Sequence, residues 1–377
     1  MKELFETIFL LASIQGALLA IALFFRKENH TANIYLALVI FALSLELITA
    51  VYYSKGWYLT HIHYSGLTYP IPLTYGPLFY FYTKHLTKKQ NTFSLKNLSH
   101  FIPFISVYIL IFPVFFYPEN EKIAFVQKMI SSNQPAIYDF VEMAIPVQGL
   151  IYTYLVTSLV ANYNINIKES FSFIERINLS WLKYLALGMI VCWSIVAISY
   201  IMDLFIDLNN SFNIALHVSV SIIIYSVGYL SLSQPEIFIK PSEGENKEEK
   251  IEKYKKSGLD KESAETIKSK LIDLMDKQKP YLDSELTLNK LAEMLSVSSH
   301  HLSEVINSSI GKTYYDFVNE YRVEEFKRKL IDPSTSNYNL LSIAFDSGFK
   351  SKTSFNTIFK KYTNKTPSEY KSSLTYK

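Results

Sequence analysis

The chain has 377 residues, a formal net charge of +3 and a single cysteine, Cys192, which excludes a disulfide framework or a cysteine-based zinc site within one chain. Hydrophobic residues make up 49% of it, and their distribution excludes a single water-soluble fold. Apolar and aromatic residues dominate before Gln234, whereas Lys, Glu, Asp and Ser dominate after it. The sequence therefore predicts one part that faces lipid and another that faces water.

Seven apolar stretches precede residue 233. The first, Leu4–Phe25, has the roughly 20 mostly apolar residues that a helix needs to cross the hydrocarbon core. The third is the weakest candidate, because Pro70, Pro72 and Pro77 interrupt it. We predict a polytopic helical membrane domain over residues 1–233, whose remaining spans are Ile34–Tyr53, Leu67–Tyr82, His100–Tyr117, Ile137–Val160, Leu179–Phe205 and Phe212–Leu232.

Lys and Arg residues in the short loops predict the orientation, because they are preferentially retained on the cytoplasmic side. One alternating set of loops holds nine of them and the other set holds three. This bias predicts an outside N-terminus and, after seven spans, a cytoplasmic C-terminus. The larger set is Arg26, Lys27, Lys84, Lys88, Lys89, Lys96, Lys168, Arg176 and Lys183; the smaller is Lys55, Lys122 and Lys128.

Four polar residues fall inside or near predicted spans: Glu46, Glu142, Asp203 and His217. An ionisable group at membrane depth is costly, so each is a candidate for function. Glu46 and Glu142 are candidates for sensing a ligand or a proton. Alternatively, they hydrogen-bond across helices as structural residues or lie near an interface.

A change of composition follows the last span. Gln234-Pro235 ends that span, and the alternating charges between Glu243 and Lys256 are typical of a solvated spacer. We therefore predict a charged linker over residues 234–258 and a water-soluble domain over residues 259–377. In this domain apolar residues return at helical spacing, first at Ile267, Leu271, Leu274 and Met275.

Two short helices joined by a tight turn are predicted next. Thr287 can cap the first helix, a turn follows at Ser296-Val297, and Ser298 or Ser299 can cap the second. This is the pattern of a helix-turn-helix, although any amphipathic helix pair would share it. The inward residues are Leu288, Leu291, Ala292, Leu295, Leu302, Val305 and Ile306, and the second helix presents His300, Ser303, Glu304 and Asn307 outward.

The same pattern recurs 52 to 53 residues later. Gly348-Phe349 forms the turn and Ser351 can cap the second helix. A continuous helical pattern from Tyr314 to Leu330 would join the two units, and the segment from Thr366 through Pro367 to Glu369 is a start signal for a final helix. The inward residues of the repeat are Leu340, Ile343, Ala344, Phe355, Ile358 and Phe359.

Basic charge is concentrated on and after the second helix of the repeat. From Lys350 to the end there are seven lysines and one acidic residue, Glu369, whereas residues 260–349 carry more acidic than basic side chains. These lysines interleave with an ordered apolar pattern, which favours contact with nucleic-acid phosphates over a solvated tail.

These residues closely resemble the AraC/XylS family of bacterial transcription regulators over about Leu286 to Lys371. The preceding Tyr254–Leu259 and Lys279–Leu282 segments resemble the subgroup, common in Bacteroidetes-type bacteria, whose sensor half is a multi-span membrane domain. The residues that carry the family resemblance are Leu291-Ala292, His301-Leu302-Ser303, Gly311, Tyr321-Arg322, Ile343-Ala344, Gly348-Phe349, Ser351, Phe355, Phe359-Lys360-Lys361, Thr366-Pro367 and Tyr370.

The resemblance implies that each unit inserts its second helix into one of two successive major grooves. Candidate phosphate contacts are Ser351, Lys360 and Lys361. Asn364 stands where the family usually has glycine, and Asn tolerates a left-handed backbone. The candidate base contacts are His300, Ser303 and Glu304 in the first unit and Lys352, Thr353, Asn356 and Thr357 in the second; a basic or polar reader is more common than Glu304 at its position.

The sequence thus predicts an all-α, membrane-embedded transcription regulator in the bacterial inner membrane. The expected partners are double-stranded DNA, the lipid bilayer, RNA polymerase and an unidentified signal, with a homodimer as an open alternative. The absence of HExxH, Walker and GxSxG motifs predicts no enzyme, and we expect no catalytic residue, cofactor or metal. Two alternatives remain: a transporter or channel-like protein with a regulatory DNA-binding tail, and a factor released from the membrane by proteolysis.

Overall fold

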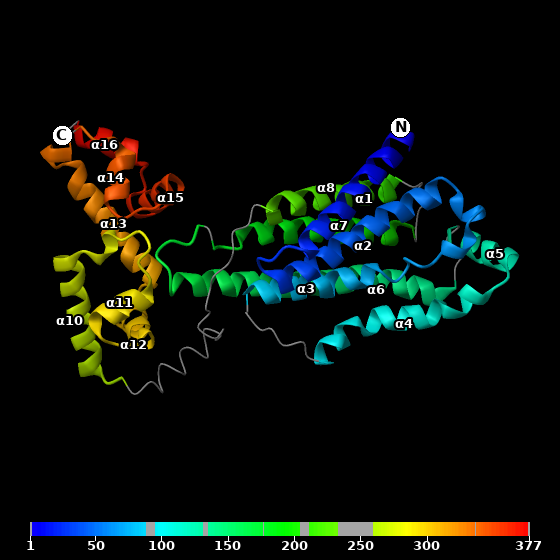
Figure 1. Ribbon diagram of the computed structural model, residues 1–377, viewed down its shortest axis with the longest axis horizontal. Coiled ribbons are helices and arrows are strands. Elements are labelled where there is room, and N and C mark those ends of the chain that lie inside the picture. The colour runs from blue at the N-terminus through cyan, green and yellow to red at the C-terminus, as the bar shows by residue number, and fades with distance from the viewer. Residues whose placement is uncertain are drawn as a thin grey trace. The chain divides into compact units, whose positions relative to one another are not determined.

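The computed structural model describes residues 2–87, 95–130, 135–175, 177–203, 211–232, 259–335 and 337–375. Its regular elements in these ranges are helices, as the all-α prediction requires (Figure 1). The chain forms two compact units, which we call the N-terminal unit (residues 1–161 and 179–241) and the C-terminal unit (residues 162–178 and 242–377). The predicted linker at 234–258 lies outside the described residues.

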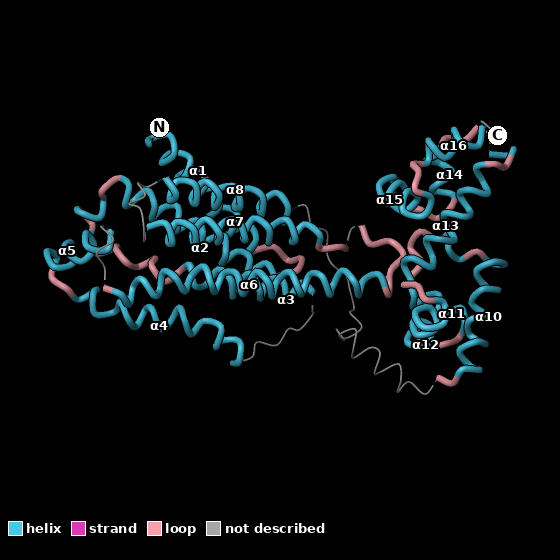
Figure 2. Tube along the Cα trace, turned by 180° about the vertical axis from the view of Figure 1, so that it is seen from behind, coloured by secondary structure: helices cyan, strands magenta, loops and turns pink. Residues whose placement is uncertain are grey.

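The N-terminal unit is built of long apolar helices. Of these, α1, α2, α7 and α8 lie alongside one another, as Figure 2 shows. The helices are α1 (Lys2–Phe24), α2 (His30–Ser54), α3 (Pro72–Thr87), α4 (Ile102–Ile111), α5 (Glu119–Ile130), α6 (Ala136–Lys168), α7 (Ser180–Asp203) and α8 (Ser211–Leu232), with short 3-10 helices at Trp57–Leu59, Ile62–Tyr64, Leu95–Phe101 and Phe112–Phe116.

Five helical segments in the described residues have the length and composition to cross a membrane, and they match five of the seven predicted spans. The predicted third span is only 16 residues long as α3, which contains Pro77, and the described apolar part of the seventh is Ile214–Val227. The seven-span count therefore stays a prediction. The five segments are Lys2–Phe24, His30–Ser54, Lys96–Phe116, Ala136–Lys168 and Ser180–Ser199.

Small residues allow these helices to approach closely. A Cβ on Gly16 of α1 would lie 2.2 Å from the hydroxyl of Ser44 in α2, and a Cβ on Gly149 of α6 would lie 2.2 Å from the ring of Trp193 in α7. The Ser13 hydroxyl donates to the Ser44 carbonyl at 2.9 Å, linking α1 to α2. Close backbone approach at small residues, with hydrogen bonds across helices, is the packing expected of helices in lipid.

The C-terminal unit contains the two predicted helix pairs. The first pair is α11 (Leu288–Leu295) with α12 (Ser299–Glu304), which continues as a π-helical turn over Val305–Ile310. The second pair is α14 (Leu340–Asp346) with α15 (Lys352–Thr363). The remaining helices are α10 (Lys261–Gln278), α13 (Tyr314–Leu330) and α16 (Pro367–Thr375), with short 3-10 helices at Pro280–Leu282 and Pro333–Thr335.

The helix starts predicted from capping residues are confirmed. The side chains of Thr287, Ser298 and Ser351 each accept a hydrogen bond from the backbone N–H three residues later. At α16 the predicted reciprocal cap also forms, because the Glu369 N–H donates to Thr366 Oγ1 at 3.3 Å and the Thr366 N–H donates to Glu369 Oε2 at 2.7 Å. These caps fix where each helix begins.

The predicted joining helix is confirmed as α13, and it contributes to both hydrophobic cores of the unit. Its first half, including Phe317 and Val318, packs in a core with α10, α11 and α12. Its second half, including Val323 and Phe326, packs in a core with α14 and α15. One continuous helix that is buried in both cores holds the two helix pairs at a fixed separation.

The turn of the second pair requires glycine. Gly348 has φ +90°, and a Cβ there would lie 2.2 Å from the carbonyl oxygen of Tyr281. Any other side chain would be strained by both the backbone conformation and this contact. Asn364, which follows α15, adopts a left-handed conformation with φ 58°, as expected for Asn at a position usually held by glycine.

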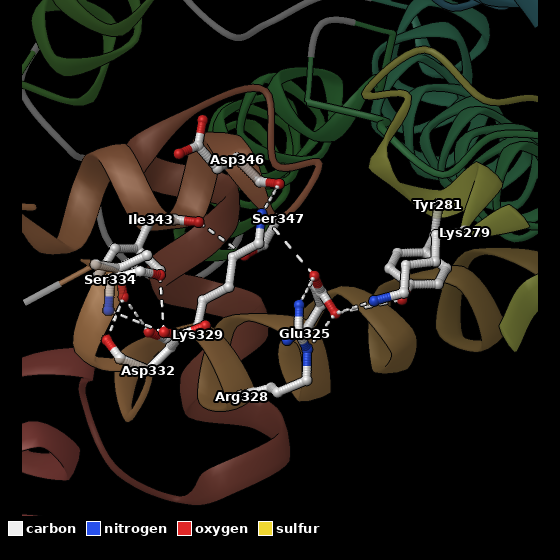
Figure 3. Close-up of polar contacts among 11 residues, drawn as sticks. Lys279, Tyr281, Glu325, Arg328, Lys329, Asp332, Ser334, Ile343, Asp346 and Ser347 are labelled. Atoms are coloured by element: carbon white, nitrogen blue, oxygen red, sulfur yellow. Dashed lines mark hydrogen bonds and ion pairs between the residues drawn. The ribbon is translucent and has the colours of Figure 1, made fainter. Parts of the chain in front are cut away.

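Glu325 on α13 is a buried carboxylate held by several donors (Figure 3). Its side chain is 4% exposed and accepts hydrogen bonds from Arg328 at 2.6 and 3.0 Å, from Lys279 at 3.3 Å and from the Tyr281 hydroxyl at 3.4 Å. The hydrogen bond from Arg328 and the bond from Lys279 lower the pKa of Glu325, against the opposing effect of burial. Burial and the nearby Glu325 carboxylate raise the pKa of Tyr281 to about 12.

Replacing Glu325 with Gln should destabilise the C-terminal unit by about 1–3 kcal/mol at neutral pH, because hydrogen bonds to a charged group are lost. The lowered pKa in the folded state means that this stabilisation is present above the unfolded pKa and is lost as pH falls through the folded pKa. Urea unfolding of a 259–377 fragment, followed by circular dichroism, should therefore show a higher free energy of unfolding for the wild type than for Glu325→Gln. This difference should become smaller as the pH is lowered. Glu324→Gln, at an exposed neighbour, is the control. If the free energies of unfolding of wild type and Glu325→Gln differ by the same amount at pH 7 and at pH 3, the charged form of Glu325 is not what stabilises the unit.

Candidate nucleic-acid interface

One face of α15 is polar and open. The four predicted base-contact residues of the second unit, Lys352, Thr353, Asn356 and Thr357, are all exposed, as is Lys360. The opposite face, formed by Phe355, Ile358 and Phe359, is at most 2% exposed and packs against α13 and α14. The helix thus presents donors, acceptors and positive charge along one side, which is what reading base edges in a major groove requires.

The two lysines predicted to contact phosphates differ in their surroundings. Lys360 lies on the exposed face of α15 with the base-contact candidates. Lys361 lies at its edge, where its ammonium group is 2.5 Å from the Asp316 carboxylate on α13 and near the Tyr362 ring. Lys361 is therefore tied to α13, and Lys360 is the better placed of the two for phosphate contact.

In the first helix pair, α12 presents its predicted base-contact residues in the same arrangement, but these side chains are less exposed. His300, Ser303 and Glu304 stand 53 residues before Thr353, Asn356 and Thr357, but the former three are half-buried. One carboxylate oxygen of Glu304 is buried and has no hydrogen-bond partner among the described residues, so this side chain is less open than its counterpart in α15. The sequence did not predict the π-helical turn that ends this helix.

Asn307 is the remaining residue of the predicted outward face in the first helix pair. Its amide donates to Ser303 at 3.3 Å and to the Glu169 carboxylate at 2.7 Å. Ser351, the predicted phosphate contact at the start of α15, likewise donates its hydroxyl to the Glu175 carboxylate. Two acidic residues from the segment after α6 thus bind polar residues at the second helices of the two helix pairs.

The sequence predicts only a loop between two spans at residues 161–178, so it does not mark this segment. Residues 162–178 form part of the C-terminal unit, where Ser172 is 1% exposed beside the buried Arg322 of α13. Burial lowers the pKa of Arg322 to about 10, and the nearby Asp283 carboxylate partly opposes this effect. One signal was available: the helical pattern after Val160 continues to Lys168, so that α6 has 33 residues, more than a single span needs.

The two candidate sensing residues line one cavity in the N-terminal unit. The cavity has a volume of about 950 Å³, and both Glu46 and Glu142 contribute to its wall. The Tyr75 hydroxyl donates to Glu46 at 3.2 Å, and His217 Nε2 lies 4.0 Å from the same carboxylate. The fourth polar candidate, Asp203, has a side chain outside the described residues.

Comparison with known proteins bears on the C-terminal unit. A family described as a helix-turn-helix domain matches residues 291–373. This region is an AraC-type helix-turn-helix domain. Curated relatives from Staphylococcus aureus strains COL, MSSA476 and N315, each named as an uncharacterized HTH-type transcriptional regulator, are 32% identical over 91 residues.

The similarity is confined to one part of each protein. The matched 91 residues are 24% of this chain and only 12% of each relative. The chain therefore covers about one eighth of the length of the curated relatives that it matches. No solved structure matches the chain.

Proposed function

We propose that this protein is a membrane-embedded, one-component transcription regulator, in which the N-terminal unit senses a signal and the C-terminal unit binds specific DNA sequences. The observation that carries the proposal is the open polar face of α15 within a matched helix-turn-helix domain. In this proposal RNA polymerase is a further partner, and a homodimer would double the DNA site.

The geometry of the C-terminal unit supports binding to one face of a duplex. α13 is buried in both hydrophobic cores and therefore fixes the distance between α12 and α15. Two recognition helices held in this way can enter successive major grooves, about one helical turn apart. In this arrangement the exposed residues of α15 read base edges, and Lys360 and Ser351 contact the phosphates that position the domain.

Base-reading residues and phosphate-contacting residues should respond differently to substitution. Asn356→Ala or Lys352→Ala should weaken binding to the cognate site by roughly 1–3 kcal/mol while barely changing binding to scrambled DNA. Lys360→Ala should weaken binding to the cognate and the scrambled duplex alike. It should also reduce the slope of the logarithm of the binding constant against the logarithm of the salt concentration by about one. Lys361→Ala is the matched control, and we expect a smaller change in slope because its partner is Asp316.

Chromosomal mapping of the intact protein supplies the cognate site, and each purified variant is then titrated against cognate and scrambled duplexes at two salt concentrations. Equal losses on both duplexes for Asn356→Ala would remove that residue from the reading face. No binding of the wild-type protein to any genomic DNA would overturn the proposed function.

The surface of the N-terminal unit supports insertion in a bilayer. Large apolar side chains point outward along its helices, as in Leu18 (64% exposed), Ile109 (69%) and Phe140 (69%). Water would disfavour such continuous apolar exposure, whereas lipid would not. Residues 162–178 belong to the C-terminal unit, which supports the predicted cytoplasmic side for this loop and for the DNA-binding domain together.

Reporter fusions test this topology. Fusions after Lys27, Lys96 and Lys183 should report the cytoplasm, and fusions near Lys55 and Lys128 should report the outside. The physical reason is the retention of Lys and Arg on the cytoplasmic side. Cell fractionation before and after stimulation separates action at the membrane from release by proteolysis. An inverted or irregular fusion pattern would rule out the seven-span arrangement.

The cavity of the N-terminal unit is where we place signal recognition. Because Glu46 and Glu142 both line it, Glu142→Gln or Glu46→Gln should change inducible transcription severalfold at an unchanged protein level. Reporter activity and immunoblots are measured together, with Glu121→Gln, at an exposed position on α5, as the control. Loss of protein instead of altered induction would assign these carboxylates to helix packing.

A further inference from the structure

Residues 169–175, which we call the docking segment, pack on α11 and α13 within the C-terminal unit. The segment connects α6 to α7 in sequence and pairs with the start of α11. Phe171 forms an antiparallel bridge with Thr287, the Leu288 N–H donates to the Ser170 carbonyl at 3.1 Å, and the Ser172 hydroxyl donates to the Leu286 carbonyl at 2.7 Å.

The centre of the docking segment occupies a site built from buried polar side chains. Asn319 and Arg322 of α13 are 0% and 2% exposed. The Asn319 amide donates to the Ser172 carbonyl at 3.0 Å, and Arg322 donates to the same carbonyl at 3.4 Å and to the Ser172 hydroxyl at 3.2 Å. Buried donors cost free energy when they are left without acceptors, so this site favours an acceptor-bearing occupant.

Each end of the docking segment carries an acid that binds one of the two helix pairs. Glu169 accepts from Asn307, on the outward side of the first pair. Glu175 accepts from the hydroxyl of Ser351, the cap of α15. Phe173 lies between them in sequence, and its ring is 5.5 Å from the Lys350 ammonium group.

The groups that the segment occupies are of the kind that bind DNA phosphates. Helix N-termini donate backbone N–H groups to anions and carry a partial positive charge, and such contacts provide much of the positioning on a duplex. Here the N–H at the first position of α11 and the hydroxyl that caps α15 both donate to oxygens of the docking segment. A duplex bound across both helix pairs would offer its phosphates as alternative acceptors for these donors.

We propose that the docking segment and DNA compete for this surface, with Glu169 and Glu175 in the place of phosphates. The docked segment leaves the base-reading face of α15 open and occupies the donors at its start and at the start of α11. DNA binding then requires residues 169–175 to leave the surface. Because the segment is continuous with α6 and α7, a movement of either helix on signal binding would change how readily it leaves. This inference rests on the proposed DNA-binding function.

A reversible disulfide tests the competition in the intact protein. Residues paired across an antiparallel bridge have Cα atoms about 4.5–5.5 Å apart, which a disulfide can span. The variant Phe171→Cys/Thr287→Cys, in a Cys192→Ser background and in lipid nanodiscs, should bind cognate DNA at least about fivefold more weakly when oxidised than when reduced. The single-cysteine variants control for the redox treatment.

Removing the two acids tests the same point without a crosslink. Glu169→Gln/Glu175→Gln should bind both cognate and scrambled duplexes about fivefold or more tightly, because the competing carboxylates are lost. Glu262→Gln/Glu265→Gln, at exposed positions of α10, has the same net charge change and should bind as the wild type does.

The outcomes separate this inference from the proposed function. If DNA binds equally to the oxidised and reduced forms, or more weakly to the Glu169→Gln/Glu175→Gln variant than to wild type, the segment is a structural support and the competition is overturned while DNA binding stands. If the wild-type protein binds no DNA in any form, both proposals fail.

Discussion

The buried guanidinium of Arg322 is the interaction on which the C-terminal unit depends. A cation that is 2% exposed is tolerated only when its donors are satisfied. Besides Ser172, Arg322 donates to the carbonyls of Tyr281 and Asp283 at 2.8 Å each and to Asn319 at 3.2 Å. These acceptors come from three separate stretches of chain, so one side chain links the turn before α11, the middle of α13 and the docking segment.

The second turn is constrained at the same place. A Cβ on Gly348 would lie 3.0 Å from the Nε of Arg322 as well as 2.2 Å from the Tyr281 carbonyl. The turn of the second helix pair therefore packs directly on the backbone that Arg322 holds. Both helix pairs are positioned relative to α13 through this contact and through the two cores, which explains how a unit with short helices can hold α12 and α15 at a fixed separation.

The parts of this structure that the sequence predicted are those set by local physical chemistry. Thr287, Ser351 and Thr366 are capping residues whose hydrogen bonds reach only three residues along the chain, and the continuous helix α13 follows from helical periodicity. The docking of Ser172 on Arg322 joins residues 150 apart in sequence, and no periodicity marks such a contact. The ion pair of Lys361 with Asp316 is also non-local, so an exposed lysine on α15 and one bound to α13 look alike in the sequence.

The placement of charge within the C-terminal unit gives the docking segment its proposed role. Lysines gather on and after α15, while the outward face of α12 presents half-buried His300, Ser303 and Glu304. A lysine-rich helix alone would bind any duplex through its phosphates. In the proposed function such general binding is a disadvantage, because DNA binding is meant to depend on a signal. In the proposed competition, Glu175 at the cap of α15 lowers this general affinity, and the exposed side chains of Lys352 and Asn356 stay open. A ligand shifts an equilibrium only by its difference in affinity for the two states. In the proposed competition, a signal recognised by the N-terminal unit would therefore change DNA binding by altering only the docking of residues 169–175. The largest change in DNA affinity that a signal can produce in this way is then set by the free energy with which that segment docks.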